Sequence, residues 1–309
     1  MRIVVRIGIL AAVVAGVFGA AMALFTPEQR TLSTARFMAS YKNSAPQIVI
    51  GVLSEYSLPF LHASGFIRPM DMDLGRGIKM HLDARDLVPR TILANGVYEP
   101  VTTKLLEDHL PVGGTFVDIG AHIGLHSLLA AAKVGAQGQV LSVEPNPDTL
   151  VELRRNLELS QAKQVAVQPV ACSDKEGKLD LFAGSMANTG MSSLSKKTAE
   201  AEGESGRRFA VRARPLDDIV TEMGLTRIDA MKIDVEGAEL FVLKGALRTL
   251  ERFHPFLVME VKEDQLAAMG TTKAAVLSLL QDLGYTPGRS FEGNVEFVYG
   301  SKLSSQQTR

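Results

Sequence analysis

From about Val101 to Gly300, short apolar runs alternate with stretches that have the spacing of helices. The apolar runs include "TFVDIG", "VLSVEPN", "AMKIDVEG" and "FLVMEV", and the stretches between them include "LHSLLAAAKV" and "PDTLVELRRNLELS". Continuous apolar strands that alternate with helices of ten or more residues are typical of a mainly parallel sheet covered on both faces. The sequence therefore predicts a doubly wound α/β domain.

One helix of this domain carries its own start signal. Leu150, Leu153 and Leu157 repeat at helical spacing, Asn146 can cap the first turn, and Pro147 suits the first helical position. We therefore expect a helix that begins at Pro147.

The first 26 residues differ from the rest. Ile7–Phe25 holds roughly nineteen residues without a charge, and a helix needs about 20 such residues to span a bilayer. A cleaved secretory signal is the alternative, because Arg2 and Arg6 form a positive start and Ala21–Ala23 resembles a cleavage site. The apolar run exceeds the usual signal core of about 7–15 residues, so we expect an uncleaved transmembrane anchor.

The next segment, residues 27–95, is expected to form a stalk and a small lead-in that contains β-structure. The polar stretch that ends near Lys42 is helix-prone, and Pro46–Tyr56 reads as a strand. Residues 96–300 form the predicted α/β domain, and residues 301–309 are expected to be a disordered tail. Within the domain, residues 183–208 are rich in Gly, Ser, Lys and Glu and predict a long loop.

Composition excludes several classes of protein. The formal net charge is −1, from 33 basic and 34 acidic residues, and no long basic run occurs, so nothing indicates a nucleic-acid partner. The chain has one cysteine, Cys172. An intrachain disulfide and a zinc cluster built on thiolates are therefore excluded.

Acidic residues stand where several of the predicted strands end. In open α/β sheets the ligand binds beyond the carboxyl ends of the strands. A series of acids at successive ends is harder to explain as solvated turns than a single one would be. These acids are Asp118, Glu144, Asp174, Asp234 with Glu236, and Glu260.

The turn "DIGAHIG" indicates the kind of ligand. Gly120 and Gly124 let the backbone approach a ligand, but the G-x-G-x-x-G order that suits a pyrophosphate is missing. Glu144 ends the next strand, where such folds place a carboxylate on ribose hydroxyls. Together these residues favour a nucleoside without a pyrophosphate, such as S-adenosylmethionine. The alternative is a tight structural corner.

The chain at this point resembles a known family. "GVYEP", "FVDIGAHIGLHSLLAA", "VLSVEPNP", "VACSD", "NTGMSSL", "LDD", "IDAMKIDVEGAELFVLKGA" and "LVMEV" occur in the order seen in FkbM-type methyltransferases, a branch of the class I, Rossmann-like, S-adenosylmethionine-dependent enzymes. The resemblance covers roughly Gly96 to Glu260. It implies transfer of a methyl group to a hydroxyl of a sugar, glycan, lipid-linked or secondary-metabolite acceptor.

The resemblance also implies roles for individual residues. The donor-binding turn matches four residues, Glu144 matches the ribose-binding acid, and three residues fall where the adenine edge is usually met. Asp234 and Glu236 lie where class I enzymes place groups beside the methyl end of the donor, and Glu99 is a weaker candidate for the same cavity. The turn residues are Asp118, Gly120, Ala121 and Gly124, and the adenine-edge residues are Cys172, Ser173 and Asp174.

Further positions come from the comparison of motifs. His122 stands where the family commonly has asparagine, and an imidazole keeps a donor and an acceptor near the cofactor. His122 and His126 are four residues apart, but no third metal ligand is evident, so we expect no metal. Asn188 and Ser192 match the family's "N.G.SSL" loop and could close over the site; a solvated linker is the alternative.

A hydroxyl is a poor nucleophile, so a positioned base such as Asp234 or Glu236 would assist the transfer. A structural reading of Glu236, as an acid that opens the "GAELFVLKGA" helix, stays open. For Glu144, we expect an exposed strand-end acid whose loss costs little stability. Two other functions stay open: a nicotinamide-dependent oxidoreductase of the same fold, and a membrane-tethered nucleoside-binding domain without catalysis.

The charges that flank residues 7–25 do not decide the membrane orientation. The methyl donor is made in the cytoplasm, so we expect a membrane-anchored enzyme with a cytoplasmic catalytic domain and a membrane-proximal acceptor. Export after signal cleavage is the alternative.

Overall fold

A computed structural model of the chain describes residues 25–41, 58–185, 187–201 and 206–300. These residues divide into two compact units, which are described separately. The smaller unit comprises residues 25–41, 58–74, 79–98, 185 and 187–190. The larger unit comprises residues 75–78, 99–184, 191–201 and 206–300.

The smaller unit contains a helix in the polar stretch that follows the predicted anchor, as expected, and α2 packs against α5. It also contains the expected β-structure, as a two-stranded sheet of β1 and β2. Its elements are α2 (Pro27–Tyr41), α4 (Leu58–Ala63), β1 (Met70–Gly75), β2 (Ile78–Leu82) and α5 (Leu87–Asn95).

Several predictions fall outside the described residues. They are the strand at Pro46–Tyr56, the tail at 301–309 and, except for its last residue, the membrane helix at 7–25. Among the helices that the structure describes, none combines the length and the apolar character that crossing a bilayer requires.

The larger unit is built on a seven-stranded sheet with the order β11-β12-β10-β9-β3-β4-β5. Strands β5, β4, β3, β9 and β10 run parallel, and β12 and β11 are antiparallel at one edge. The predicted mainly parallel, Rossmann-like sheet is therefore confirmed. The strands are β3 (Thr115–Ile119), β4 (Gln139–Val143), β5 (Val165–Gln168), β9 (Ala230–Ile233), β10 (Phe256–Glu260), β11 (Tyr285–Phe291) and β12 (Asn294–Tyr299).

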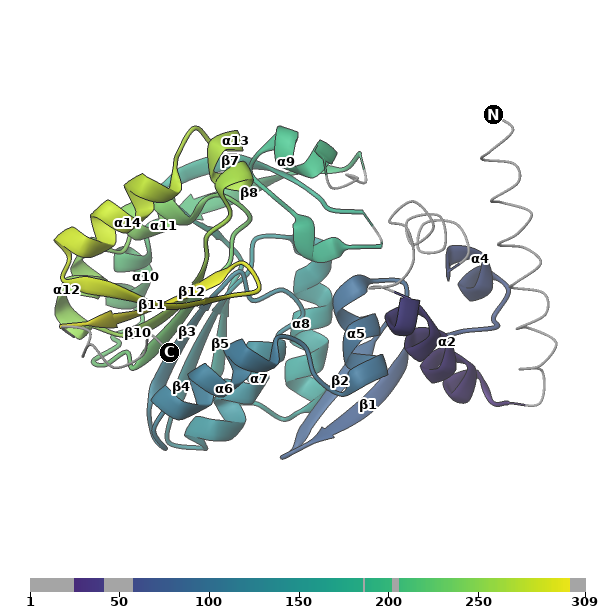
Figure 1. Cartoon of the computed structure of the whole chain (residues 1–309). Helices are drawn as coiled ribbons and strands as arrows, with labels where there is room; N and C mark the ends of the chain where they lie inside the picture. The colour runs from purple at the N-terminus through teal and green to yellow at the C-terminus, as the bar shows by residue number, and fades with distance from the viewer. Residues whose placement is uncertain (1–24, 42–57, 186, 202–205, 301–309) are drawn as a thin grey trace, which may run out of the picture. The chain divides into compact units, whose positions relative to one another are not determined.

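Both faces of this sheet are covered, because alternate strand residues enter two different cores (Figure 1). Val117 and Ile119 of β3 pack in one core with apolar residues of α10, α11, α12 and α14. Phe116 of the same strand packs in the other core with α6 and α7. The helices are α6 (Pro100–His109), α7 (Leu125–Val134), α8 (Pro147–Leu159), α10 (Leu216–Glu222), α11 (Glu239–Lys244), α12 (Leu247–Phe253), α13 (Glu263–Ala268) and α14 (Lys273–Asp282).

Helices α7 and α8 begin where the sequence predicts. Helix α8 starts at Pro147, and the Asn146 side chain caps it by accepting a hydrogen bond from the Asp148 backbone at 3.0 Å. The expectation of ten or more residues per helix is wrong for α10 to α13, which have six or seven.

Gly245 explains the break between α11 and α12. A Cβ atom at this glycine would lie only 2.0 Å from the Ser173 carbonyl oxygen, so only glycine allows the two backbones to touch. The close packing of Ser173 at this point is a tertiary contact, which no helical pattern in the sequence reveals.

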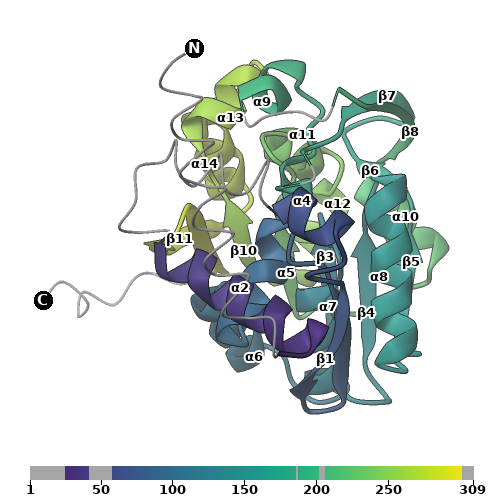
Figure 2. The same ribbon diagram turned by 90° about the vertical axis from the view of Figure 1, so that its right-hand side faces the viewer.

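A second, three-stranded sheet was not predicted. Its order is β6-β8-β7, and Figure 2 shows the three strands gathered together. Strands β7 and β8 flank the predicted long loop, and the loop itself contains a 3₁₀ turn and the short helix α9. The elements are β6 (Ala171–Cys172), β7 (Gly177–Phe182), the 3₁₀ turn Thr189–Met191, α9 (Lys196–Ala201) and β8 (Arg208–Arg214).

Candidate active site

A row of polar side chains crosses the sheet near the carboxyl ends of its central strands. Asp118 of β3 pairs in register with Ser142 of β4 on one side and with Lys232 of β9 on the other. These residues alternate with those of the α10–α14 core, so they lie on the face that carries α6 and α7. All three are buried, which places polar chemistry inside an otherwise apolar sheet.

Asp118 lies within β3, one residue before its end, and is held from the side of α7. Its Oδ2 accepts a hydrogen bond from Ser127 Oγ at 2.6 Å, and Ser142 Oγ donates to Ser127 Oγ at 2.7 Å. Its Oδ1 is buried and has no hydrogen-bond partner among the described residues. That oxygen remains able to accept a hydrogen bond.

The glycine turn after β3 touches the turn after β9. Gly120 has a φ of 83°, and a Cβ atom there would lie 1.8 Å from the Asp234 carbonyl oxygen. Gly124, with a φ of 89°, similarly has no room beside Leu153 of α8, whose Cδ1 would lie 2.5 Å from a Cβ atom. Ala121, between them, is buried. The glycines therefore fix the backbone at the strand ends through contacts within the protein.

Glu144 follows β4 and ties two turns together. Its Oε2 accepts the His122 backbone N–H at 2.9 Å, and its Oε1 accepts the Asn146 backbone N–H at 2.8 Å. The side chain is buried, so the expectation of an exposed acid is wrong. The pKa of Glu144 is raised to about 7, chiefly because the side chain is buried. The two backbone hydrogen bonds lower this pKa, and the nearby Asp118 and Asp234 raise it.

The Glu144 carboxylate still offers lone pairs to a ligand. An ionised carboxylate has about four lone-pair sites, and the two backbone N–H groups use one on each oxygen. The remaining sites can accept hydrogen bonds from a diol, as the ribose prediction requires.

Lys232 is the buried cation of the site. Its Nζ donates to Asp234 Oδ2 at 2.8 Å. Glu99, which precedes α6 and has a left-handed backbone with a φ of 47°, acts on the same ammonium electrostatically. His126 Nε2 lies 3.7 Å from Glu99 Oε2. Glu99 and Asp234, both predicted site residues, are thus brought together around a lysine.

Burial governs the charges of this group. It raises the pKa of Glu99 and lowers that of His126 to about 4, so His126 is neutral near pH 7. Burial alone would raise the pKa of Asp234 too, but the adjacent Lys232 ammonium outweighs it and the net shift is downward. Asp234 is therefore ionised.

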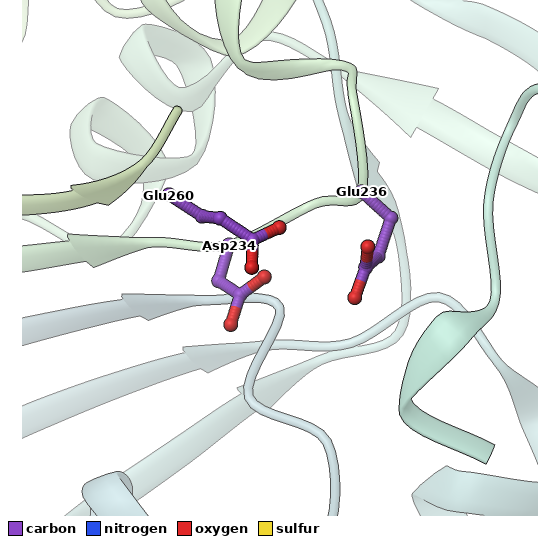
Figure 3. Close-up of side chains that lie close together, drawn as sticks. All are labelled: Asp234, Glu236 and Glu260. Atoms are coloured by element: carbon purple, nitrogen blue, oxygen red, sulfur yellow. The ribbon is translucent and has the colours of Figure 1, made fainter. Parts of the chain in front are cut away.

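Three carboxylates meet beside this group (Figure 3). Asp234 directly follows β9, Glu236 lies on the loop to α11, and Glu260 is the last residue of β10. Each offers an oxygen atom, and these oxygens all lie within 4.8 Å of one another. The structure therefore brings both predicted catalytic residues together, with Glu260 as a third member.

Each of the three carboxylates is paired with a lysine or a glutamine side chain. Lys262 Nζ lies 2.6 Å from Glu260 Oε1, and Gln265 Nε2 donates to Glu236 Oε2. Burial raises the pKa of Glu236 well above its usual range, assisted by Glu260 and Asp234, and raises that of Glu260 to about 8. Asp234 thus carries the charge, while Glu236 and Glu260 favour their protonated forms.

Oxygen ligands of this kind suit a hard cation such as Mg²⁺. Here Lys232 and Lys262 already form ion pairs with two of the three carboxylates, Asp234 and Glu260. We therefore assign no metal to this cluster.

The acid at the start of α11 is Glu239, not Glu236. Glu239 Oε1 accepts the Gly237 N–H at 3.1 Å and the Val235 N–H at 3.3 Å. Glu236 lies before the helix with a left-handed φ of 53°. The structural reading of Glu236 as a helix-opening acid is therefore wrong, and a non-glycine residue in this conformation is uncommon.

The three residues predicted at the adenine edge lie at the end of β6 and directly after it. Asp174 follows β6 of the small sheet rather than a strand of the parallel sheet. The Cys172 side chain is buried in the core, where burial raises the pKa of its thiol to about 12. The Ser173 backbone N–H donates to the Arg214 carbonyl. Their part in binding an adenine stays a prediction.

The two residues predicted in the loop, Asn188 and Ser192, belong to different units. Ser192 Oγ accepts hydrogen bonds from Asn146 Nδ2 at 3.0 Å and from the Gly184 N–H at 3.1 Å, so it lies close to the Glu144 turn. Asn188 belongs to the smaller unit, where its N–H donates to the Ser185 carbonyl. The roles of Asn188 and of the His122 side chain stay predictions.

Sequence reasoning missed Lys232, Lys262 and Gln265 and did not choose Glu260 for the site. A signal for Lys232 exists, because a lysine inside the apolar run "AMKID" must find a buried partner. Gln265 has no such signal, since it reaches Glu236 from α13 across the fold.

The chain is similar in sequence to known methyltransferases. The family model described as Methyltransferase FkbM domain matches residues 118–287. Methyltransferase SdnD of Sordaria araneosa is 31% identical over 221 residues, which cover 63% of this chain and 83% of SdnD. The 2-O-methyltransferase NoeI of Sinorhizobium fredii is 26% identical, covering 68% of this chain and 90% of NoeI. The hexuronic acid methyltransferase AglP of Haloferax volcanii is 26% identical, covering 51% of this chain and 60% of AglP.

Proposed function

The chain belongs to the FkbM family of S-adenosylmethionine-dependent methyltransferases, and we propose that it transfers the methyl group to a hydroxyl oxygen of a sugar-containing acceptor. The cofactor is S-adenosylmethionine. The alternative of a nicotinamide-dependent oxidoreductase is set aside by this membership.

The observation that carries the assignment of the donor site is the Glu144 turn. Glu144, held by the His122 and Asn146 N–H groups, keeps acceptor sites for a ribose diol. The Gly120 turn beside it leaves backbone rather than side chains at the strand end. These residues fit a nucleoside without a pyrophosphate, and they would hold the adenosine part of the donor.

The carboxylates after β9 suit the methyl end. S-adenosylmethionine supplies an activated methyl group on a positively charged sulfur. The ionised Asp234 would lie beside that charge and would accept the proton that the acceptor hydroxyl loses. Glu236, the other candidate base, would have to lose its own proton first, because burial raises its pKa. In-line placement of the hydroxyl supplies much of the remaining rate enhancement.

The acceptor class is supported by the names of two relatives. AglP is named as a methyltransferase of a hexuronic acid, and NoeI as a 2-O-methyltransferase. A methyl ether on a sugar ring combines these two descriptions. For this chain, a free sugar, a glycan and a lipid-linked sugar remain within the same proposal.

The test has two parts. Calorimetry of the full chain with S-adenosylmethionine and with NAD should show binding of the first alone. Mass spectrometry of envelope glycans and lipids incubated with enzyme and donor should then detect a product heavier by one methyl group. Donor binding without any methylated product would favour the alternative of a silent, membrane-tethered binding domain.

We propose further that residues 7–25 anchor the enzyme in a membrane and that its catalytic unit is cytoplasmic. The support is the uncharged length of this segment and the cytoplasmic supply of the donor. Protease added to intact cells should leave the segment around Lys196 and Lys197 uncut. Cleavage there without lysis, or a mature protein that begins near Leu24, would contradict this topology.

A further inference from the structure

Lys232 is the charged residue of the "MKIDVEG" motif to which the proposed function gives no role. It lies on β9 between strands β3 and β10, and only 4% of its surface is exposed. A buried ammonium is destabilising by several kcal/mol unless it is paired. A lysine kept at the centre of a sheet therefore calls for an explanation.

Strand geometry directs this lysine to Asp234. Alternate residues of a strand project from the same face, so Lys232 and the residue two positions later share one side of the sheet. The 2.8 Å contact between Lys232 Nζ and Asp234 Oδ2 follows from this spacing. The Asp234 side chain remains 22% exposed against 5% for Lys232, so the lysine holds the carboxylate from the buried side.

We propose that Lys232 is a positioning residue for methyl transfer, whose ammonium keeps the Asp234 carboxylate ionised and in one orientation at the methyl end of the donor. This proposal rests on the proposed function, because that function places Asp234 at the methyl end. Lys232 itself need not contact the donor or the acceptor.

The other charged groups around Asp234 make the lysine necessary. The Asp234 charge helps to keep Glu236 and Glu260, whose oxygens lie within 4.8 Å, in their protonated forms, and Asp118 and Glu99 interact with the same ammonium. His126 is neutral near pH 7 and does not compensate. Lys262 contributes a weaker attraction, since its own direct contact is with Glu260. Without Lys232, Asp234 would lose the cation that it contacts directly and would be left among acidic groups.

The decisive experiment measures the charge of Asp234 directly. The full chain, labelled with ¹³C at aspartate side-chain carboxyls, is titrated by NMR, and Asp234→Asn identifies the Asp234 signal. In Lys232→Met the titration midpoint of this signal should move up by about one pH unit or more, because an opposite charge at this distance is lost. Lys232→Arg should restore the wild-type position.

The matched control is Lys244→Met, which removes an exposed lysine from α11 and should leave the signal unchanged. If Lys232→Met does not fold, the double variant Lys232→Met with Glu99→Gln removes one of the uncompensated acids and takes its place. An Asp234 signal that follows the wild-type titration in the folded variant would overturn the proposal.

Turnover gives the functional readout. In the Lys232→Met variant, turnover should fall at low pH and recover as the pH rises through the new Asp234 midpoint. A uniform loss at all pH values would indicate a merely structural lysine and contradict the proposal. Calorimetry with S-adenosylmethionine on the wild-type chain is independent of this result, so failure of the proposed function would be recognised separately.

Discussion

Replacement of Glu144 by alanine should damage both the fold and the donor site. The carboxylate accepts two backbone N–H groups, from His122 at 2.9 Å and Asn146 at 2.8 Å, and it is buried. Each N–H left without a partner costs about 1–3 kcal/mol. We therefore expect the free energy of unfolding to fall by about 2–6 kcal/mol.

The effect on the donor can be estimated in the same way. Two ribose hydroxyls bound to an ionised carboxylate contribute about 1.5–3 kcal/mol each. Their loss amounts to about 3–6 kcal/mol, and every 1.4 kcal/mol is tenfold in affinity. S-adenosylmethionine should therefore bind about 10²- to 10⁴-fold more weakly.

Urea unfolding followed by circular dichroism measures the first effect, and calorimetry of the folded variant measures the second. Glu158→Ala is the control, because Glu158 is an exposed glutamate on the adjacent α8 and should change stability by less than about 0.5 kcal/mol. If Glu144→Ala unfolds like the control, the hydrogen-bond reasoning is refuted. Wild-type donor affinity in the variant would remove Glu144 from the donor site.

Three further predictions follow from the same region. Gly120→Ala should destabilise the chain by about 2–6 kcal/mol, because alanine strains the positive φ and its Cβ clashes with the Asp234 carbonyl. The control is Gly135→Ala, at a glycine with a similar φ and open space around it, which should lose less stability. Equal losses of stability in urea unfolding would refute the clash. Asp234→Asn and Glu236→Gln should each lower turnover about 10²-fold or more while changing donor affinity less; if turnover survives in both, neither is the base. The pKa of Glu260 is raised from 4.5 to about 8, so its stabilising contribution is fully present below about pH 4.5 and is lost as the pH rises through 8. Urea midpoints should fall over that range, and an unchanged slope in Glu260→Gln would contradict the assignment.

The parts of the fold that sequence predicted correctly depend on local signals. Asn146 and Pro147 mark the start of α8 because capping and proline geometry act within one turn. Continuous apolar runs identify β3 and β9 because both faces of a parallel sheet are buried. Such signals lie within a few consecutive residues and do not depend on contacts with distant parts of the chain.

The parts that sequence did not predict depend on contacts between distant segments. The break at Gly245 requires the Ser173 carbonyl, and the burial of Glu144 requires the His122 turn to fold back over it. The acids at strand ends could be identified, but their protonation could not. Asp234 and Glu236 are only two residues apart, yet Lys232 and Gln265 give them different partners.

The contact between Gly120 and the Asp234 carbonyl has a consequence for redesign of this enzyme. The segment assigned to the donor and the segment assigned to the chemistry share one backbone contact, so neither can be remodelled without displacing the other. A library that aims at new acceptors should therefore leave residues 118–124 and 232–237 fixed. Changes are better placed in structures outside these two segments, such as the antiparallel pair β7 and β8 of the small sheet.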